Sequence, residues 1–424
     1  MNPHFQSARG MHDILPADQK YFNYFLEKSE KLAKFYGFKK INTPIVEKID
    51  LFIRSVGKNT DIVDKEMFKI ISREKGERLC LRPENTAPVC RAYLENGLSS
   101  LPQPVKLYYF GPMFRHDRPQ SGRFRQFYQF GAEIIGTQDA VCDAQIIQLT
   151  WQLLKKLGLK NLDIKINSIG CPECRDQYLS LLKNHFKGKT SSLCTDCNRR
   201  LRNSPLRVLD CKIEKCRQLA NEAPQSIDYL CTECHEHFKN LLEFLDELDL
   251  PYDLDSKLVR GLDYYTKTVF EIWPQISQAS QGALGGGGRY DGLIKLLGGK
   301  ETPGVGVSLG VERIIEQIKL QKIKIKELEN PKIFLAQVGS LAKKKALKLF
   351  HDLEESNIRT AEVLARNSLK SQLRTANKLK VKLALILGQK EALEGNVILR
   401  DMETGVQEVL PLKKIIEQLK KRLR

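Results

Sequence analysis

Residues 114–133 read FRHDRPQSGRFRQFYQFGAE, and this stretch decides how the rest of the chain can be interpreted. Aromatic and β-branched residues flank it, and RPQSG in its middle has turn composition, so the segment predicts a β-hairpin. The hairpin carries four arginines with aromatic rings between them, namely Arg115, Arg118, Arg123 and Arg125. Because a guanidinium grips phosphate and also stacks on flat rings, the pattern favours a nucleotide ligand. A solvated basic hairpin is the alternative.

Length and charge set the broad class. The chain has 424 residues, which is typical of two or three domains. Its net charge of +18 predicts a polyanionic partner, most commonly a nucleic acid. No apolar run approaches the roughly 18 residues of a membrane span, and the N-terminus lacks the apolar core of a signal peptide. The sequence therefore predicts a cytoplasmic protein without membrane attachment.

The segments upstream of the hairpin predict a helix, an edge strand and a site. Apolar spacing over residues 17–36 indicates a long amphipathic helix, and KKINTPIVE at 39–47 indicates a strand. Pro44 cannot donate a hydrogen bond to a sheet, so we expect this strand at an edge or an interface. In LRPENTA, at 81–87, Thr86 is well placed as the N-cap of a helix beginning near Ala87. Glu84 is then expected at the mouth of a site and not in the core.

Residues 170–250 predict a mostly helical insertion rich in cysteine. Eight of the chain's eleven cysteines fall here, namely Cys171, Cys174, Cys194, Cys197, Cys211, Cys216, Cys231 and Cys234. A C-x-x-C pair lets two thiolates bind one metal ion, and two such pairs make a tetrahedral structural zinc site. The spacing does not reveal which pairs combine, and His235 and His237 are further possible ligands. Unpaired buried thiols are the alternative.

The segments after the insertion contain no phosphate-binding loop. Residues 256–273, which include LVRGLDYYT, are expected to form a strand, and the four glycines at 285–288 are expected to form a loop. Gly299 and Lys300 are followed by Glu301, where a phosphate loop needs Ser or Thr. Side chains must therefore hold any nucleotide, which points back to the arginines of the hairpin.

The C-terminal part differs in pattern from the rest. Residues 319–329 are charged and glycine-free, which is typical of a linker. Residues 331–424 alternate short strands with helices and predict a compact α/β domain. This domain holds 20 Lys and Arg against 10 Asp and Glu, and so supplies +10 of the total charge. Such a balance favours a nucleic-acid-binding domain, with a lysine-rich solvated surface as the alternative.

Taken together, these motifs resemble those of class II aminoacyl-tRNA synthetases, and more closely those of the histidyl-tRNA synthetase family. The first helix with the Pro44 strand resembles the first class motif, FRHDR with RFRQF the second, and GVGVSLGVERI at 304–314 the third. LVRGLDYYT and LRPENTA resemble the histidine-specific signatures, and the resemblance covers essentially the whole chain. One departure is Asp117, where the class pattern usually has glutamate.

The resemblance implies an α/β (α+β) fold with two domains. Residues 1–325 would form an antiparallel-sheet catalytic domain with the helical insertion, and residues 331–424 an anticodon-binding domain. It also implies a homodimer, with tRNA(His), L-histidine and ATP with Mg²⁺ as partners. In the implied reaction, histidine and ATP give histidyl-adenylate and pyrophosphate, and the histidine then passes to the 3′ end of the tRNA.

The resemblance also assigns the site residues. Arg115 and Arg260 are the expected catalytic residues. The expected histidine-binding residues are Glu84, Asn85, Thr86, Arg115, Gln129, Glu133, Arg260, Tyr264 and Tyr265. The expected ATP-binding residues are Arg115, Asp117, Arg123, Phe127 and Arg313. Neutral imidazole has one donor and one acceptor, which a carboxylate such as Glu133 and a hydroxyl such as Tyr264 can satisfy.

Two other functions fit parts of the sequence. A regulatory relative of the same fold would bind histidine without charging tRNA, but it would lack the basic C-terminal domain and some of the arginines. A nucleic-acid-binding protein without catalysis would leave LVRGLDYYT and LRPENTA unexplained.

Overall fold

The computed structural model describes residues 5–58, 60–71, 74, 76–118, 122–275, 282–325 and 331–423. The chain divides into two compact units, Met1–Ile325 and Lys326–Arg424. Each unit has its own sheet and its own buried core. Within the described ranges, no helix combines the length and apolar composition needed to cross a membrane.

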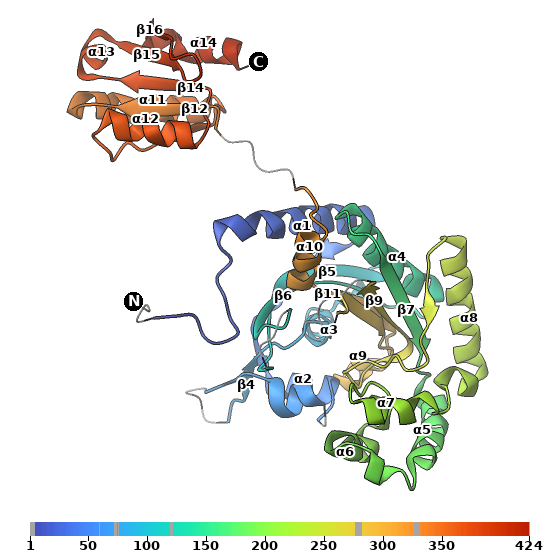
Figure 1. Ribbon diagram of the computed structural model, residues 1–424. Helices are drawn as coiled ribbons and strands as arrows, with labels where there is room; N and C mark the ends of the chain where they lie inside the picture. The colour runs from blue at the N-terminus through green and yellow to red at the C-terminus, as the bar shows by residue number, and fades with distance from the viewer. Residues whose placement is uncertain are drawn as a thin grey trace. The chain divides into compact units, whose positions relative to one another are not determined.

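The N-terminal unit is built on a sheet of eight strands, counted over the described residues (Figure 1). In spatial order they are β1 (Lys39–Lys40), β5 (Val105–Phe114), β6 (Gln126–Ile135), β11 (Gly304–Gly310), β10 (Gly285–Arg289), β9 (Thr266–Pro274), β7 (Leu162–Ser168) and β8 (Asp253–Leu254). All central pairs are antiparallel, and only the two-residue edge strands β1 and β8 pair in parallel. The expected hairpin is β5 and β6, and the expected antiparallel fold is confirmed.

Helices cover both faces of this sheet, because successive strand residues point to opposite sides. One core is formed with α1 (Pro16–Phe35), α4 (Ala140–Lys156), α8 (Thr232–Glu247) and α10 (Val311–Leu320) (Figure 1). The other is formed with α2 (Ile49–Ser55), α3 (Thr86–Glu95), α9 (Leu293–Leu296) and much of the insertion. Tyr108 belongs to the first core and the adjacent Tyr109 to the second.

Pro44 divides the strand that we expected at residues 39–47. The chain forms β1, breaks, and resumes as β2 (Val46–Lys48), which pairs with β4 (Leu79–Leu81) and β3 (Lys69–Ile70) in a separate sheet. Both pieces lie at sheet edges, as expected for a strand with a residue that cannot donate.

Two expectations downstream of the insertion are wrong. The glycine run is not a loop, because residues 285–289 form β10 in the interior of the sheet. A Cβ at Gly287 would lie 1.9 Å from the carbonyl oxygen of Gly306, so the tight spacing of the strands requires glycine there. Conversely, the strand expected from residue 256 begins only at Thr266, and the LVRGLDYY residues before it form a loop.

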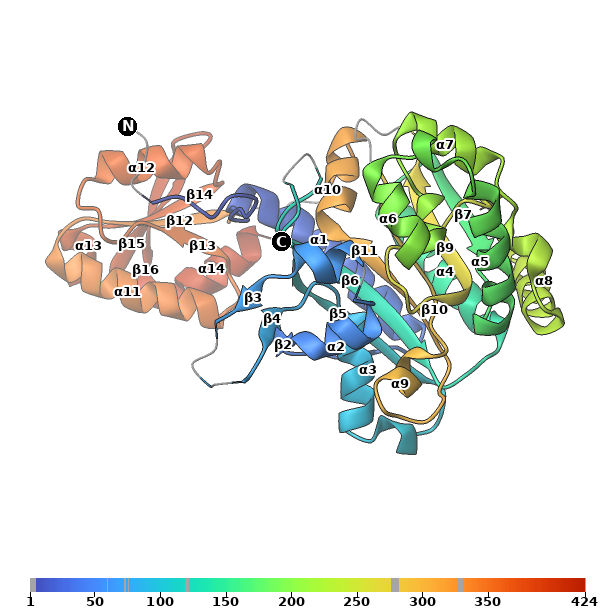
Figure 2. The same ribbon diagram turned by 90° about the horizontal axis from the view of Figure 1, so that it is seen from below.

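The insertion is helical, as expected (Figure 2). Its helices are α5 (Pro172–Phe186), α6 (Thr195–Asn203), α7 (Glu214–Asn221) and α8, with short 3₁₀ turns at Thr190–Ser192, Pro205–Val208 and Ser226–Tyr229. Tyr178, Leu182 and Phe186 of α5 are buried in the second core of the main sheet. The insertion therefore packs as part of the N-terminal unit.

The C-terminal unit is a mixed sheet of five strands within residues 331–423. In spatial order they are β13 (Thr360–Glu362), β12 (Ile333–Gln337), β14 (Leu383–Leu387), β15 (Asn396–Asp401) and β16 (Gln407–Pro411). One face packs on α11 (Ser340–Glu355), α13 (Gln389–Glu394) and α14 (Ile415–Arg422), and the other on α12 (Leu369–Lys378). The expected α/β fold is confirmed, although the short α13 was not foreseen. Residues 326–330 of the expected linker lie outside the described residues.

Candidate active site

A cavity of about 330 Å³ opens on the face of the sheet that carries Tyr109. Segments far apart in the chain line it, and their lining residues are Glu84 and Thr86, then Arg115, Asp117, Gly122, Arg123, Phe124, Phe127 and Gln129, then Arg260, Gly261, Leu262, Tyr264 and Tyr265, then Glu271, Trp273 and residues 283–286, and finally Ser308, Gly310, Glu312 and Arg313. Asp210 and Lys212 of the insertion also reach it. The cavity therefore draws its walls from the hairpin, both signature segments and the third class motif.

The floor of the cavity is a row of residues that pair across five strands. Tyr109 lies opposite Gly131, which lies opposite Ser308, then Gly286, then Glu271. Residues paired in this way point to the same face of a sheet. The Tyr109 side chain covers Gly131, where a Cβ would lie 2.2 Å from its ring, so Gly286 is the glycine of this row that leaves room for a group approaching from above.

Arg260 occupies the space above one of these glycines. A Cβ at Gly286 would lie 2.8 Å from Nη1 of Arg260, and the same nitrogen donates to Oε1 of Glu271. The Arg260 guanidinium also lies over the Tyr265 ring, 5.8 Å from its centroid. Burial alone would lower the pKa of Arg260, but Glu271 raises it above its ordinary value. Arg260 is thus a fixed, permanently charged group in the cavity.

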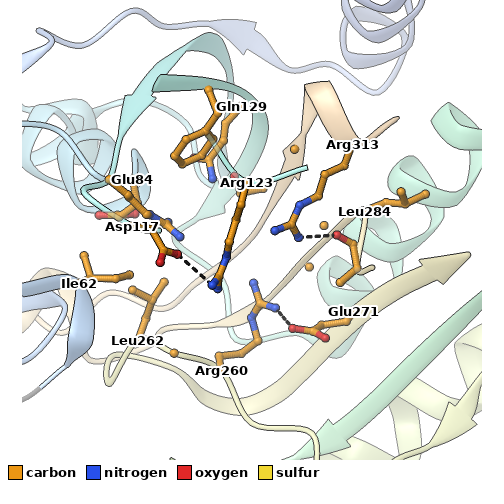
Figure 3. Close-up of a pocket in the computed structure, with 18 of the residues that line it drawn as sticks. Ile62, Glu84, Asp117, Arg123, Gln129, Arg260, Leu262, Glu271, Leu284 and Arg313 are labelled. Atoms are coloured by element: carbon orange, nitrogen blue, oxygen red, sulfur yellow. Dashed lines mark hydrogen bonds and ion pairs between the residues drawn. The ribbon is translucent and has the colours of Figure 1, made fainter. Parts of the chain in front are cut away.

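Three further arginines line the same cavity, and Figure 3 labels two of them, Arg123 and Arg313. Arg123 pairs with Asp117 at 3.0 Å, and Arg313 donates to the backbone oxygens of Gly122 and Ala283. Arg115 donates to the carbonyl of Pro83 at 2.8 Å, and its guanidinium lies 5.4 Å from the centroid of the Phe127 ring. Backbone carbonyls hold two of the cations without neutralising them.

This cavity concentrates positive charge. Burial lowers the pKa of Arg313, and the nearby charges of Arg123 and Arg115 lower it further. Like charges held this close repel one another, and an anionic ligand between them relieves the repulsion. The arrangement is suited to a polyphosphate or to a phosphate together with a carboxylate.

Glu84 and Glu133 form a buried acidic end of the site. Glu84 caps α3 with both oxygens, which accept from the backbone nitrogens of Thr86 at 2.7 Å and Ala87 at 3.1 Å. Glu84, and not Thr86, is therefore the capping side chain, and burial leaves it 4% exposed. Glu133 lies behind Thr86, whose hydroxyl donates to it at 2.8 Å, and it also accepts from the Tyr290 hydroxyl at 2.7 Å. Burial raises the pKa of Glu133 to about 8.

Aromatic rings and free polar atoms complete this end. Tyr264 and Tyr265 line the cavity with their ring centroids 4.7 Å apart. Oε1 of Gln129 and Nε of Arg260 are buried and have no hydrogen-bond partner among the described residues. Because buried polar groups are normally paired, these two atoms indicate where a polar ligand would bind.

Two family comparisons match this chain. The histidyl-tRNA synthetase family matches residues 10–314, and the anticodon binding domain family matches residues 332–422. This chain belongs to the histidyl-tRNA synthetase family. A histidine–tRNA ligase of Dehalococcoides mccartyi is 46% identical over 419 residues, which cover 99% of this chain and 100% of that protein. One from Desulforamulus reducens is 44% identical over 415 residues, which cover 98% of each.

A solved structure of the same family has the same fold. The crystal structure of apo histidyl-tRNA synthetase from S. aureus is 34% identical, with a TM-score of 0.80 over 98% of this chain and 99% of that one.

Most of the residues that the sequence marked in this synthetase lie around the one cavity. They are Glu84, Thr86, Arg115, Asp117, Arg123, Phe127, Gln129, Arg260, Tyr264, Tyr265 and Arg313. Asn85 does not line it, because its side-chain oxygen accepts from Thr43 at 2.6 Å and from Arg82 at 3.2 Å. Glu133 lies one hydrogen bond behind the wall, so its expected contact with imidazole stays a prediction. Arg125 of the hairpin bonds the backbone of Arg9 and Asp117 instead.

Other lining residues were missed by sequence reasoning. Glu271 lies in TKTVFEIW, and a single acid within such an apolar strand was a signal that could have been used. Asp210 and Lys212 carried no signal, because they reach the cavity only through the packing of the insertion.

The cysteines of the insertion form two groups of four. Cys171, Cys174, Cys231 and Cys234 make one, and Cys194, Cys197, Cys211 and Cys216 make the other. His237 belongs to neither group, and its ring lies 3.4 Å from Oδ1 of Asp143. The exposed His235 lies 3.8 Å from Glu236.

Proposed function

We propose that this chain is a histidine–tRNA ligase. It activates L-histidine with ATP to give histidyl-adenylate and pyrophosphate, and then transfers histidine to the 3′ end of tRNA(His). The observation that carries this proposal is the convergence of four arginines with the LRPEN and LVRGLDYY segments on one cavity.

The difficulty of the first step is electrostatic. A histidine carboxylate oxygen must attack the α-phosphorus of ATP while the bond to the β-phosphate oxygen breaks, so two anions have to meet. Arg115 and Arg260 would stabilise the charge that develops between them, and groups of this kind are worth about 10² to 10³ in rate each. In the second step a ribose hydroxyl of the tRNA attacks the carbonyl carbon, AMP leaves with the bonding electrons, and the hydroxyl proton is released.

The ATP would lie at the end of the cavity formed by the hairpin and the third class motif. Arg123 and Arg313 would bind the outer phosphates of the magnesium salt of ATP. Phe127 would stack on one side of the adenine and Arg313 on the other. Asp117 supports this arrangement, because its Oδ2 lies 3.0 Å from Nη1 of Arg123. Although its side chain is shorter than the usual glutamate, it would orient Arg123 toward the phosphates.

The histidine would lie at the acidic end. Glu84 and Thr86 would take its α-amino group, with Gln129 and its free oxygen beside them. Glu133 and Tyr264 would satisfy the imidazole, and Tyr265 would close the pocket. A site that pairs both ring nitrogens rejects amino acids lacking them, because its own polar groups would be left unpaired.

Residues 1–325 would carry out both chemical steps, and residues 331–424 would bind the anticodon region of the tRNA. The chain would act as a homodimer in the cytoplasm. Support for an interface comes from Ile45 and Val46 next to Pro44, which are 43% and 42% exposed although apolar. Residues 119–121 of the hairpin loop lie outside the described residues. The proposed reaction uses no thiol, so the cysteine groups stand outside it.

ATP–pyrophosphate exchange with each of the twenty amino acids tests the proposal. Histidine alone should support exchange, and adding tRNA should give histidyl-tRNA. Histidine binding without exchange would instead indicate the regulatory relative. Exchange with a different amino acid would overturn the assignment of the acidic end.

A further inference from the structure

The two cysteine groups of the insertion lie outside the reaction and have a geometry of their own. Each brings together four thiols from two segments of chain, and in each group all four sulfurs lie within 4.8 Å of one another. The first group joins the starts of α5 and α8. The second joins the start of α6 to the segment that leads into α7.

The sulfur spacings match one tetrahedrally bound ion. Sγ of Cys171 lies 3.6 Å from that of Cys174 and 3.9 Å from that of Cys231, and the sulfurs of Cys174 and Cys234 are 3.7 Å apart. A tetrahedron with zinc–sulfur bonds of about 2.3 Å has edges of about 3.8 Å. Bonded disulfide sulfurs would be only about 2.05 Å apart.

The second group has a similar sulfur spacing. The sulfurs of Cys194 and Cys211 are 4.0 Å apart, and the backbone nitrogen of Cys194 donates to Sγ of Cys216 at 3.3 Å. In the first group the backbone nitrogen of Cys171 donates to Sγ of Cys174 at 3.2 Å. Backbone N–H groups aimed at sulfur favour the thiolate, which is the form that binds a metal.

We propose that each group binds one Zn²⁺, so that every chain carries two structural zinc ions with all-cysteine ligands. Four thiolates in a closed tetrahedron are the typical ligand set of a structural zinc site. The structure also resolves the pairing that spacing left open: each ion joins two segments, and the two sites share no ligand.

The first site would fix one wall of the active-site cavity. Gly170, next to the ligand Cys171, accepts from the backbone nitrogen of Lys267 at 2.9 Å. Arg175, next to the ligand Cys174, donates to the carbonyl of Tyr265. The ion would thereby tie the start of α5 to the backbone that carries Tyr265 into the cavity.

The second site would fix the other part of the insertion that lines the cavity. Its ligand Cys211 lies between Asp210 and Lys212, which both line the cavity. Arg200 of α6 and Arg207 of the 3₁₀ turn Pro205–Val208 form ion pairs with Asp61 at 3.1 and 2.7 Å. The ion would hold this segment against the body of the domain. Neither site touches the proposed reacting atoms, so this inference does not depend on the proposed function.

Metal analysis of the purified full-length protein tests the proposal. We expect two zinc ions per chain and less than a tenth as much iron. Because the whole chain is used, the count does not depend on any variant folding. A zinc content below about 0.2 per chain, a single ion, or iron in its place would overturn it.

Cysteine-to-serine variants test the pairing. Replacing Cys171, Cys174, Cys231 and Cys234 together should remove one zinc ion and leave the other, whereas mixed pairing would remove both. Replacing Cys171, Cys174, Cys194 and Cys197 together should remove both. Cys142→Ala, which changes a buried cysteine outside the groups, is the matched control and should keep two.

A thiol titration of the wild-type chain gives a second measurement if a variant does not fold. A mercurial reagent should release both zinc ions as the cysteines of the two groups react. Zinc that stays bound after all eleven thiols have reacted would contradict cysteine ligation.

Discussion

Arg260 is the residue on which the proposed chemistry depends most, and the structure pairs it with Glu271. We predict that Arg260→Ala folds and still binds histidine by calorimetry but loses about 10² to 10³ in histidine-dependent pyrophosphate exchange. The loss follows from removing a fixed cation beside the α-phosphate.

Two controls separate this effect from others. The first is Arg260→Ala combined with Glu271→Gln, which also removes the carboxylate that loses its cation in the single variant. Its pyrophosphate exchange should be as slow as that of Arg260→Ala, because the missing cation, and not the carboxylate left behind, causes the loss. Arg54→Ala changes an exposed arginine of the same unit and should exchange normally. Near wild-type exchange by Arg260→Ala would remove Arg260 from the mechanism.

Glu133 should make stability depend on pH. Burial raises its pKa from 4.5 to about 8 in the folded protein. Between these values the folded state keeps a proton that the unfolded state has released, so the free energy of unfolding falls as pH rises through this range. Glu133→Gln keeps an oxygen acceptor and removes the titration.

The melting temperature measured at about pH 5 and about pH 8.5 tests this. The melting temperature should fall less between the lower and the higher pH in Glu133→Gln than in the wild type. Glu301→Gln, at an exposed carboxylate, should behave as the wild type does. An equal decrease in Glu133→Gln would show that this carboxyl is not the group responsible.

At the scale of elements, the glycines of β10 allow the central strands to carry a site on one face. A Cβ at Gly286 would lie 2.5 Å from the carbonyl of Phe270 and 2.8 Å from Nη1 of Arg260. We predict that Gly286→Ala displaces Arg260, lowers pyrophosphate exchange at least tenfold, and destabilises the fold by about 1–3 kcal/mol.

Gly292→Ala is the matched control, because a Cβ there meets nothing within 4 Å. It should leave both exchange and the denaturation midpoint unchanged. If Gly286→Ala exchanged at the rate of Gly292→Ala, the close approach of Arg260 to the strand would not matter for activity.

At the scale of the whole molecule, the two units have separate sheets and separate cores. We predict that a chain ending at Ile325 keeps pyrophosphate exchange within a few fold of the wild type, because every residue around the cavity precedes that point. Charging of tRNA should weaken by at least tenfold, since the domain with +10 of the charge is gone.

Circular dichroism and gel filtration would establish that the shortened chain is folded and keeps its oligomeric state. A folded chain that had lost exchange would contradict this division of labour. Full tRNA charging by the shortened chain would contradict the role given to residues 331–424.

The elements of this fold differ in how well they could be predicted from the sequence. The alternation of strands and helices in the C-terminal domain could be predicted, because its apolar runs are short and alternate with amphipathic segments. The glycine strand was missed because glycine has low strand propensity and its place depends on close neighbours in β9 and β11. In the site, the arginines could be marked from motifs, but Glu271, Asp210 and Lys212 could not be assigned without knowing what they lie against.

The sequence by itself determined the family, the hairpin, the two-domain organisation and the identity of the main cations. These follow from local patterns, in which a few neighbouring residues carry the information. Only the tertiary structure decided that Glu84 caps α3, that Arg260 rests over bare backbone at Gly286, and which cysteines lie together. The reason is physical. Contacts between residues far apart in the chain depend on how whole strands and helices pack, and no short stretch of sequence contains that packing.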